Sequence, residues 1–181
     1  MKERVKILDR EFEIMIPAER IRSSIEVVAE QINRDYTEGD RVILLGVLNG
    51  SFIFLSDLAR MLNFRVEICF VKLSSYSGAA STGVVKDLIG LNCSIEGRKV
   101  IVVEDIVDTG VSIAHILNSL RGRGAAEIKV CTLFFKPNAY RGSDEINYVA
   151  MEIGNEFIVG YGLDYNELGR ELPDIYVTYD E

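Results

Sequence analysis

The sequence predicts an α/β fold in which a mainly parallel, twisted sheet is flanked by helices. Two observations support this prediction. Strand-like apolar runs alternate along the chain with segments of helical periodicity, and the strongest runs are β-branched with no polar interruption. A run that is apolar on both faces is typical of a strand buried in a parallel sheet. In such sheets, ligands bind beyond the carboxyl ends of the strands.

Three helices and five strands account for the pattern. The helices are expected from Pro17 to Ile32, from Ser51 to Leu62 and from Ile113 to Leu120, where apolar residues recur at helical spacing. The strands are expected at 42–48, 66–70, 100–103, 128–135 and 157–161. The stretch at 74–83 is rich in Ser, Gly, Ala and Thr, a composition that predicts a flexible loop.

Length and charge restrict the class of protein. A chain of 181 residues is most simply one domain, and 48% hydrophobic with 27% charged residues is ordinary for a soluble protein. The net charge of −8 argues against broad binding to nucleic acid or to anionic membranes, which requires clustered Lys and Arg. The first residues are charged, and no apolar run approaches the ~20 residues of a membrane span.

The cysteines indicate a reducing compartment. The chain has three, which is an odd number, and their spacing is not that of metal ligands. Cys69 and Cys131 lie within apolar runs and are expected to be reduced thiols in the core. We therefore expect the protein to be cytoplasmic.

The most informative segment follows the β-branched run at 100–103. Glu104 and Asp105 come directly after the run, Asp108 follows three residues later, and Thr109 to Ser112 then lead into a helical segment. Hydroxyls and free backbone N–H groups at a helix N-terminus stabilise a phosphate. Three carboxylates beside a phosphate are tolerable if they hold Mg²⁺ or sugar hydroxyls instead. A phosphorylated sugar bound with a metal ion satisfies both conditions.

Other interpretations of the acidic pair explain less. Alone, Glu104 and Asp105 could be the acidic pair of a response-regulator-like domain or a Walker-B-like magnesium site. The chain contains no G-x-x-x-x-G-K-[ST] sequence, which a P-loop nucleotide site requires. The residues from Asp108 to Ser112 favour the sugar-phosphate interpretation.

These residues resemble the phosphoribosyl-pyrophosphate motif of the type I phosphoribosyltransferase family. The resemblance extends in order from about Arg41 to Asp174, and the segment from Phe157 to Arg170 is similar to the 6-oxopurine branch, the hypoxanthine-guanine enzymes. It implies one domain with a small hood built from the chain ends, at about 1–15 and 150–181. Relatives with this fold are commonly homodimers or homotetramers.

The resemblance also implies roles for the acidic segment. Glu104 and Asp105 would hold the ribose hydroxyls, directly or through water on Mg²⁺, and Asp108 would be the general base. Asp164 would approach a second Mg²⁺, so the implied metal residues are Glu104, Asp105 and Asp164. The 5′-phosphate would be held by the residues of the loop and first helical turn, namely Asp108, Thr109, Gly110, Val111 and Ser112.

Two further groups of residues are implied by the same resemblance. The pyrophosphate would be received by Leu48, Asn49, Gly50, Ser75, Tyr76 and Arg170, with a non-proline cis peptide at Leu48-Asn49. Many relatives carry a basic residue where this chain has Asn49. The purine would be bound by Lys136, Phe157, Ile158 and Asp164.

The implied reaction transfers the 5-phosphoribosyl group from 5-phosphoribosyl-1-pyrophosphate to N9 of hypoxanthine or guanine, a step of purine salvage that gives IMP or GMP. One alternative is a regulator that binds the donor only as an effector, but such proteins usually add a DNA-binding segment or a basic RNA-binding face. A second alternative is a transferase for another base. Lys136 argues against adenine, whereas xanthine differs from the expected bases only at its 2-position.

Overall fold

The computed structural model describes residues 4–73, 88–91 and 93–179. A six-stranded sheet forms the centre of the molecule, in the order β5-β4-β3-β6-β7-β8. Five of its strands are mutually parallel, and β5 pairs antiparallel with β4. The strands are β3 (Ile43–Leu48), β4 (Glu67–Leu73), β5 (Leu88–Ile89), β6 (Lys99–Val107), β7 (Glu127–Phe135) and β8 (Tyr148–Glu152). The predicted fold class is therefore confirmed.

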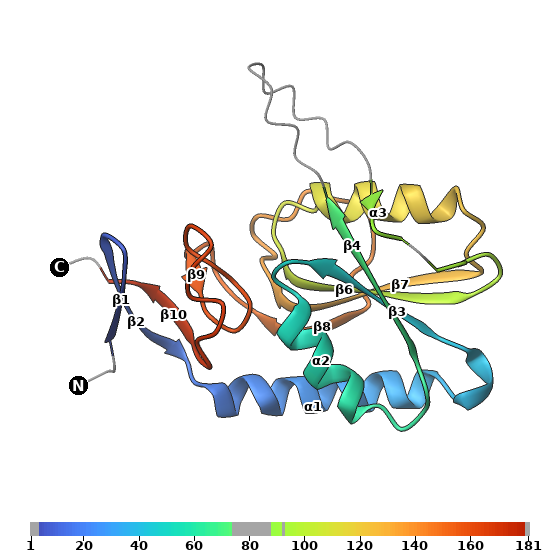
Figure 1. The fold of residues 1–181 in the computed structure, drawn as a ribbon, viewed down its shortest axis with the longest axis horizontal. Coiled ribbons are helices and arrows are strands. Elements are labelled where there is room, and N and C mark those ends of the chain that lie inside the picture. Colours follow the sequence, from blue (N-terminus) through green and yellow to red (C-terminus); the bar gives the residue numbers. More distant parts are fainter. Residues whose placement is uncertain (1–3, 74–87, 92, 180–181) are drawn as a thin grey trace, which may run out of the picture.

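Helices cover both faces of this sheet (Figure 1). Helices α1 (Ala18–Asp35) and α2 (Phe52–Met61) lie on one face and α3 (Val111–Arg121) lies on the other, while a short 3₁₀ helix spans Glu38–Asp40. The alternation of side chains along β3 shows the division: Leu44 packs in the cluster with α1 and α2, whereas Ile43 and Leu45 pack in the cluster with α3. Both clusters are fully buried, which explains the uninterrupted apolar pattern of the central strands.

The two ends of the chain form a second, smaller sheet at one end of the molecule (Figure 1). It is antiparallel, in the order β1-β2-β10-β9. Its own apolar cluster contains Ile7, Phe12, Val159 and Tyr176. We call this sheet the hood; its strands are β1 (Arg4–Ile7), β2 (Arg10–Ile16), β9 (Ile158–Val159) and β10 (Ile175–Thr178).

The large sheet has a topological switch point between β3 and β6. The chain leaves β3 toward β4 on one side, and later strands are added on the other side beyond β6. The pairing of β3 with β6 ends at Gly46 and Val103, whereas β6 continues to pair with β7 as far as Val107. The last four residues of β6 therefore lack β3 as a neighbour. An open crevice at a switch point is where ligands bind in this class of sheet.

The sequence-based strands differ from the observed ones in several places, and the strand expected at 66–70 covers Glu67–Leu73. The strand expected at 100–103 extends over Lys99–Val107, because pairing with β7 continues through the acidic residues. The strand expected at 157–161 covers only Ile158–Val159, since Gly160 has a positive φ of 106° and ends the pairing. Strands β1, β2, β5, β8 and β10 were not predicted.

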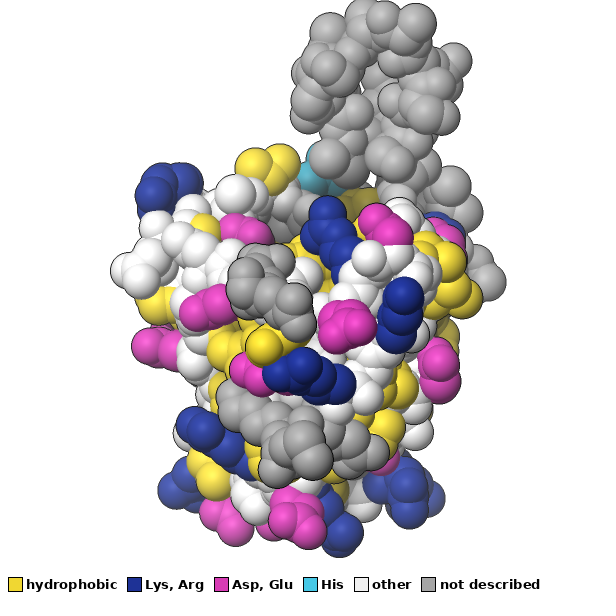
Figure 2. Space-filling view, turned by 90° about the vertical axis from the view of Figure 1, so that its left-hand side faces the viewer, with side chains coloured by type: hydrophobic (Ala, Val, Ile, Leu, Met, Phe, Trp, Pro, Cys, Tyr) yellow, Lys and Arg dark blue, Asp and Glu magenta, His cyan; other side chains and the backbone are white. Residues whose placement is uncertain are grey.

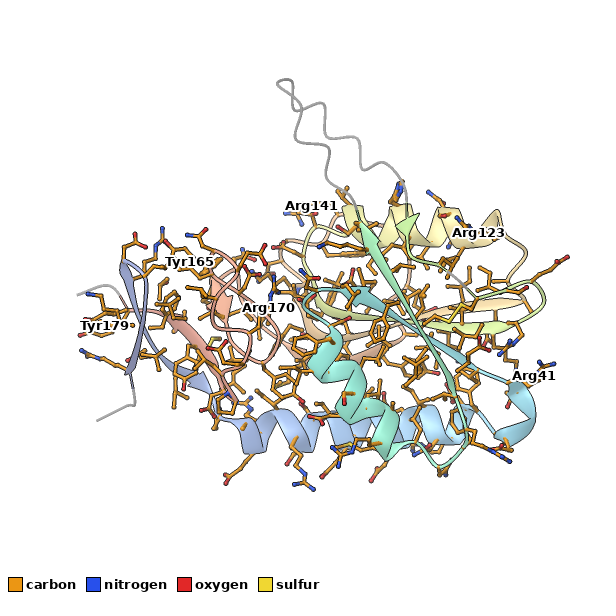
Figure 3. The ribbon with its side chains drawn as sticks, in the orientation of Figure 1. Arg41, Arg123, Arg141, Tyr165, Arg170 and Tyr179 are labelled. Atoms are coloured by element: carbon orange, nitrogen blue, oxygen red, sulfur yellow. A yellow bond between two sulfur atoms is a disulfide. The ribbon has the colours of Figure 1, made fainter. Side chains whose placement is uncertain are left out.

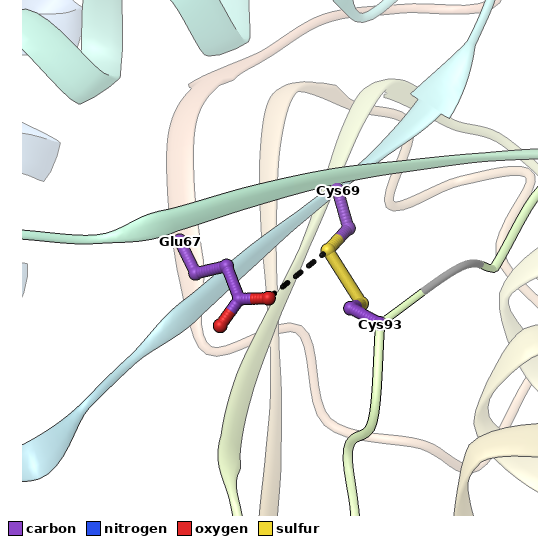
Figure 4. Close-up of side chains that lie close together, drawn as sticks. All are labelled: Glu67, Cys69 and Cys93. Carbon is purple, nitrogen blue, oxygen red and sulfur yellow. Dashed lines mark hydrogen bonds between the residues drawn. A yellow bond between two sulfur atoms is a disulfide. The ribbon is translucent and has the colours of Figure 1, made fainter.

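The prediction that Cys69 is a reduced thiol is wrong. Its side chain forms a disulfide with Cys93, and their Cα atoms are 6.7 Å apart (Figure 4). Cys69 lies on β4, and the segment after β5 turns back beside that strand and brings Cys93 to it. The third cysteine, Cys131, is a free and buried thiol as predicted, and burial raises its pKa.

The surface is consistent with the charge argument. The face that includes the hood carries Lys and Arg interspersed with Asp and Glu, and its visible basic side chains do not gather in one patch (Figure 2). Among the described residues, no helix is both long enough and apolar enough to cross a membrane.

Candidate active site

Two strands of the large sheet bring the predicted residues together at the switch point. Leu48 ends β3, and the segment 104–112 lies at the end of β6 and the start of α3. A cavity of about 320 Å³ opens between them, and Leu73 at the end of β4 forms another wall. Its lining includes Leu48 and all the predicted phosphoribosyl residues, namely Glu104, Asp105, Asp108, Thr109, Gly110, Val111 and Ser112.

The acidic pair is buried without a cation partner. Glu104 is only 6% exposed, and no Lys or Arg of the described chain lies within ion-pair distance of Glu104 or Asp105. Burial raises the pKa of Glu104 well above its usual value, and the charge of Asp105 raises it further. Burial also raises the pKa of Asp105 to about 6, although the N–H of Ile106 donates to its carboxylate. Such a pair is typical of a functional site.

Close backbone packing fixes the turn after β3 against this pair. The peptide bond between Leu48 and Asn49 is cis, which confirms what the resemblance implies. A Cβ atom at Gly50 would lie 1.5 Å from the Asp105 carboxylate, and a Cβ atom at Gly162 would lie 2.1 Å from the carbonyl oxygen of Gly50. Glycine is therefore required at both positions. The turn, the acidic pair and the loop after β9 form one packed unit.

The turn into α3 contains the residues predicted to bind a phosphate, and we call it the phosphate loop. Gly110 is the residue before the helix and has a φ of 88°, a conformation that glycine adopts without strain. The first backbone N–H groups of a helix have no acceptor within the helix, so those at the start of α3 are available to a ligand. Tyr140, which the sequence did not single out, packs against Gly110, and the N–H of Arg141 donates to the carbonyl of Thr109.

Arg170 approaches the site from the hood (Figure 3). Its guanidinium donates to the carbonyl of Gly162 at 2.8 Å and lies 2.7 Å from the carboxylate of Asp164. Glu167 lies 3.3 Å from the same guanidinium and donates its backbone N–H to Asp164. Arg170 is therefore held in place on the side of the loop that contacts Gly50.

Of the remaining predicted purine residues, Lys136 lies beside Asp108. Lys136 is buried, and its ammonium donates to the backbone carbonyl of Glu156 at 3.0 Å. The same nitrogen lies 3.6 Å from the carboxylate of Asp108, which is half-exposed. Phe157 exposes 45% of its surface, whereas Ile158 is buried in β9. Lys136 thus contacts both Asp108 and the backbone of Glu156, the residue that precedes the exposed Phe157.

The structure does not unite every predicted residue. Ser75 and Tyr76 lie outside the described residues. Glu104, Asp105 and Asp164 do not form a set of three mutually close ligand atoms; in the described part of the chain, only Glu67, Cys69 and Cys93 do so, within 4.8 Å (Figure 4). A cation at the predicted site would therefore be shared with substrate oxygens, which is common for Mg²⁺.

A larger cavity of about 570 Å³ lies elsewhere, between α2 and the segment at 171–173. Asp57, Arg60 and Tyr161 line it, and the hydroxyl of Tyr161 donates to Asp57. Its Asp57 is close to both Arg60 and the Tyr161 hydroxyl, so this carboxylate is paired, unlike Glu104 and Asp105 in the smaller cavity. Chemistry rather than volume therefore identifies the candidate site.

Comparison with known proteins agrees with this geometry. The family model described as a phosphoribosyl transferase domain matches residues 17–166. The chain belongs to the phosphoribosyltransferase family. The hypoxanthine-guanine phosphoribosyltransferase of Mycobacterium bovis is 41% identical over 90% of this chain and 83% of its own length. The enzyme of the same name from Staphylococcus aureus strain Mu50 is 38% identical, over 90% of this chain and 91% of its own length.

Solved structures of the family share the fold. A hypoxanthine phosphoribosyltransferase from Staphylococcus aureus has a TM-score of 0.83 and 37% identity, with coverage of 92% of this chain and 91% of that one. The Trypanosoma cruzi enzyme in complex with its product IMP has a TM-score of 0.85 and 37% identity, covering 97% of each chain. The type I phosphoribosyltransferase fold and membership of the hypoxanthine-guanine branch, both predicted from the sequence, are confirmed.

Proposed function

We propose that this phosphoribosyltransferase moves the 5-phosphoribosyl group from 5-phosphoribosyl-1-pyrophosphate to N9 of hypoxanthine or guanine, giving IMP or GMP and pyrophosphate. The observation that carries the proposal is the buried, cation-free pair of Glu104 and Asp105 beside a glycine-initiated helix. A phosphorylated sugar is the ligand that uses both features, because carboxylates accept from hydroxyls and helix N–H groups donate to phosphate.

The 5′-phosphate would be held by the start of α3. Thr109 and Ser112 offer hydroxyls, and Gly110 to Ser112 offer backbone N–H groups. A side chain at 110 would displace Tyr140, so Gly110 lets the backbone pass close to both Tyr140 and a ligand. The ribose hydroxyls would then donate to Glu104 and Asp105, whose backbone is fixed within β6.

The donor set fits Mg²⁺, which the fold family implies. Oxygen ligands are the ones that this cation prefers, and Glu104 and Asp105 are adjacent carboxylates that line the cavity and have no ion-pair partner among the described residues. Glu104, Asp105 and Asp164 are the residues that would hold the ions, directly or through water. When bound, Mg²⁺ neutralises charge on the donor and orients it.

The pyrophosphate would lie between the turn after β3 and the hood. Leu48 lines the cavity at the switch point, Asn49 and Gly50 follow it in the turn, and Arg170 is the cation held beside that turn through Gly162. Asn49 has no charge, so Arg170 would supply most of the positive charge that the protein places near the leaving pyrophosphate. Ser75 and Tyr76 are proposed to complete this site.

The purine edge would be read by Asp108 and Lys136. N7 and O6 are neighbouring atoms on one edge of a 6-oxopurine. The 3.6 Å between the lysine ammonium and the aspartate carboxylate suits a base whose O6 accepts from Lys136 while its N7 proton passes to Asp108. Phe157 would stack on the ring, and the backbones of Ile158 and Asp164 would bond its far edge.

Lys136 also accounts for the choice of base. A protonated lysine has three donors and no acceptor, so it pairs with the carbonyl oxygen of hypoxanthine or guanine. Adenine would present an amino group instead, whose N–H donors would face the Lys136 ammonium, and such a mismatch can cost about 10⁴-fold in kcat/KM.

Initial rates test the proposal directly. Hypoxanthine, guanine, xanthine and adenine are each supplied with the donor and Mg²⁺. We expect efficient turnover of hypoxanthine, measurable turnover of guanine and almost none of adenine. Binding of the donor without turnover of any base would instead identify a regulator. Equal rates on adenine and hypoxanthine would disprove the role of Lys136. A homodimer or homotetramer and a cytoplasmic location stay predictions.

A further inference from the structure

A series of three aromatic rings joins the purine side of the site to the hood. Phe12 of β2 is fully buried, Tyr165 packs against it with ring centroids 5.9 Å apart, and Phe157 packs on Tyr165 at the same distance. The planes of Tyr165 and Phe157 are 79° apart, which is an edge-to-face contact. The exposed ring of Phe157 is therefore supported through Tyr165 by a ring in the buried cluster of the hood.

The turn between β1 and β2 holds Tyr165 from outside. The tyrosine hydroxyl donates to the carboxylate of Asp9 at 2.9 Å, and the guanidinium carbon of Arg10 lies 5.0 Å from the ring centroid. The bond with Tyr165 is the main cause that lowers the pKa of Asp9. Two adjacent residues near the other end of the chain thus fix the ring, Asp9 by a hydrogen bond across 156 positions and Arg10 by a cation–π contact.

The backbone beside Tyr165 is also fixed. Tyr165 and Leu168 exchange backbone hydrogen bonds of 2.9 and 3.2 Å around Asn166 and Glu167, which both have positive φ. Two central residues with positive φ are typical of a type I′ turn. The arginine on the far side of this turn has its own partners at Gly162 and Asp164, so it does not depend on the tyrosine ring.

We propose that Tyr165 is a positioning residue for purine binding, which it controls through Phe157, and that the Asp9–Arg10 turn holds Tyr165 in place. The inference rests on the proposed role of Phe157 as the purine platform. It makes the N-terminal hairpin part of base recognition although no residue of the hairpin lines the cavity at the switch point.

The first experiment compares substitutions at two tyrosines of the hood. Tyr179 has a similar arginine contact, with Arg4 3.6 Å from its ring centroid, but it lies on the outer side of the hood (Figure 3). An aromatic pair contributes enough for Tyr165→Leu to raise KM for hypoxanthine about 3- to 10-fold, with KM for the donor unchanged. Tyr165→Phe keeps the ring and should change KM less than 3-fold, about as little as Tyr179→Leu.

The second experiment observes the ring itself. The chain has no tryptophan, so Phe157→Trp introduces a single tryptophan at the platform, whose emission can be excited apart from that of the tyrosines. Combination with Tyr165→Leu should lower its fluorescence anisotropy, whereas combination with Tyr179→Leu should not. Unchanged anisotropy would overturn the positioning role. Lowered anisotropy with an unchanged KM for hypoxanthine would show that the ring is positioned but is not the purine platform, and so would overturn that part of the proposed function. Equal increases in KM for both substrates would also contradict the inference.

Discussion

Acidic side chains lie in opposite environments at the two ends of the large sheet. At the amino ends of β6 and β7 the acids are paired: Lys99 lies 2.6 Å from Asp40, and Lys129 lies 3.0 Å from Asp35. A bond from Tyr148 and then the contact with Lys129 lower the pKa of Asp35. The folded protein therefore stabilises the ionised form of both carboxylates relative to the unfolded chain.

At the carboxyl end of β6, Glu104 and Asp105 lack such partners among the described residues, although Asp108 just beyond them lies 3.6 Å from Lys136. Burial raises the pKa of both Glu104 and Asp105, so ionisation there opposes folding. At one end of the sheet, ionised side chains therefore stabilise the fold. At the other end, ionisation of Glu104 and Asp105 lowers the free energy of unfolding. The comparison teaches that unpaired buried acids, rather than acids in general, indicate where a ligand is bound.

Substitution of Asp108 should have the largest effect on activity. If Asp108 is the general base, Asp108→Asn should lower kcat by about 10²–10⁴-fold. Its side chain is half-exposed, so the midpoint of thermal unfolding should change little. The control is Asp40→Asn at the opposite end, which should lower that midpoint and leave kcat unchanged. If Asp108→Asn has an unchanged kcat at every pH, Asp108 is not the base.

Gly50 gives the next largest effect, because it joins the turn after β3 to the acidic pair. A methyl group there would overlap the Asp105 carboxylate, and a displacement of about 1 Å in such a site can cost 10²-fold in rate. We expect Gly50→Ala to lower kcat/KM by about that factor. Gly39→Ala is the matched control, since its Cβ atom would meet nothing closer than 4.0 Å. Equal activity of the two variants would show that the close packing at Gly50 is not needed.

The acidic end of the sheet was predictable because its information is local. A β-branched run, three carboxylates and a glycine before a helix all lie within the segment 100–112, so the pattern itself located the site. The extension of β6 through Glu104 to Val107 was not predictable, since it depends on β7 continuing alongside after β3 has ended.

Features that depend on distant partners were missed. The disulfide joins cysteines 24 residues apart, and nothing in either local sequence indicates the pairing. Tyr165 contacts Asp9 across 156 positions, so its support of Phe157 could be found only from the structure. Strand β2 did carry a period-2 pattern in Phe12, Ile14 and Ile16, a signal that would have predicted it.

A third prediction concerns how much the carboxylate of Asp105, which has no ion-pair partner, lowers the stability of the folded protein. The pKa of Asp105 is about 6 in the folded protein, above its usual value, so folding favours the protonated carboxyl group. The stability that this group contributes is therefore complete below the unfolded pKa of about 4. It is lost as the pH rises through about 6. Asp105→Asn should therefore match the parent near pH 4 and be more stable by on the order of 2 kcal/mol at pH 8. Urea unfolding without donor or Mg²⁺ measures this difference. A variant that is less stable at pH 8 would show that Asp105 is stabilised in its ionised form.

The smallest effect should come from the Lys129–Asp35 pair at the amino end of the sheet. Its change in the free energy of unfolding should have the opposite sign to that of Asp105→Asn. Lys129 donates to Asp35 and to the hydroxyl of Tyr148; burial acts to lower the lysine pKa, but these two bonds outweigh it and raise it. Lys129→Met keeps the apolar stem and removes the charge, so we expect a loss of about 1 kcal/mol in the free energy of unfolding at pH 7, with kcat/KM unchanged.

The pH dependence of this loss follows from Asp35, whose pKa is lowered in the folded protein. The stability that this carboxylate contributes is present above its unfolded pKa and disappears as the pH falls through its folded pKa. Both differences from the parent should therefore shrink in acid, but they have opposite signs: at alkaline pH Lys129→Met is less stable than the parent, whereas Asp105→Asn is more stable. A stability loss for Lys129→Met that is constant from pH 8 to pH 3 would mean that packing, and not the ion pair, holds this end of the sheet.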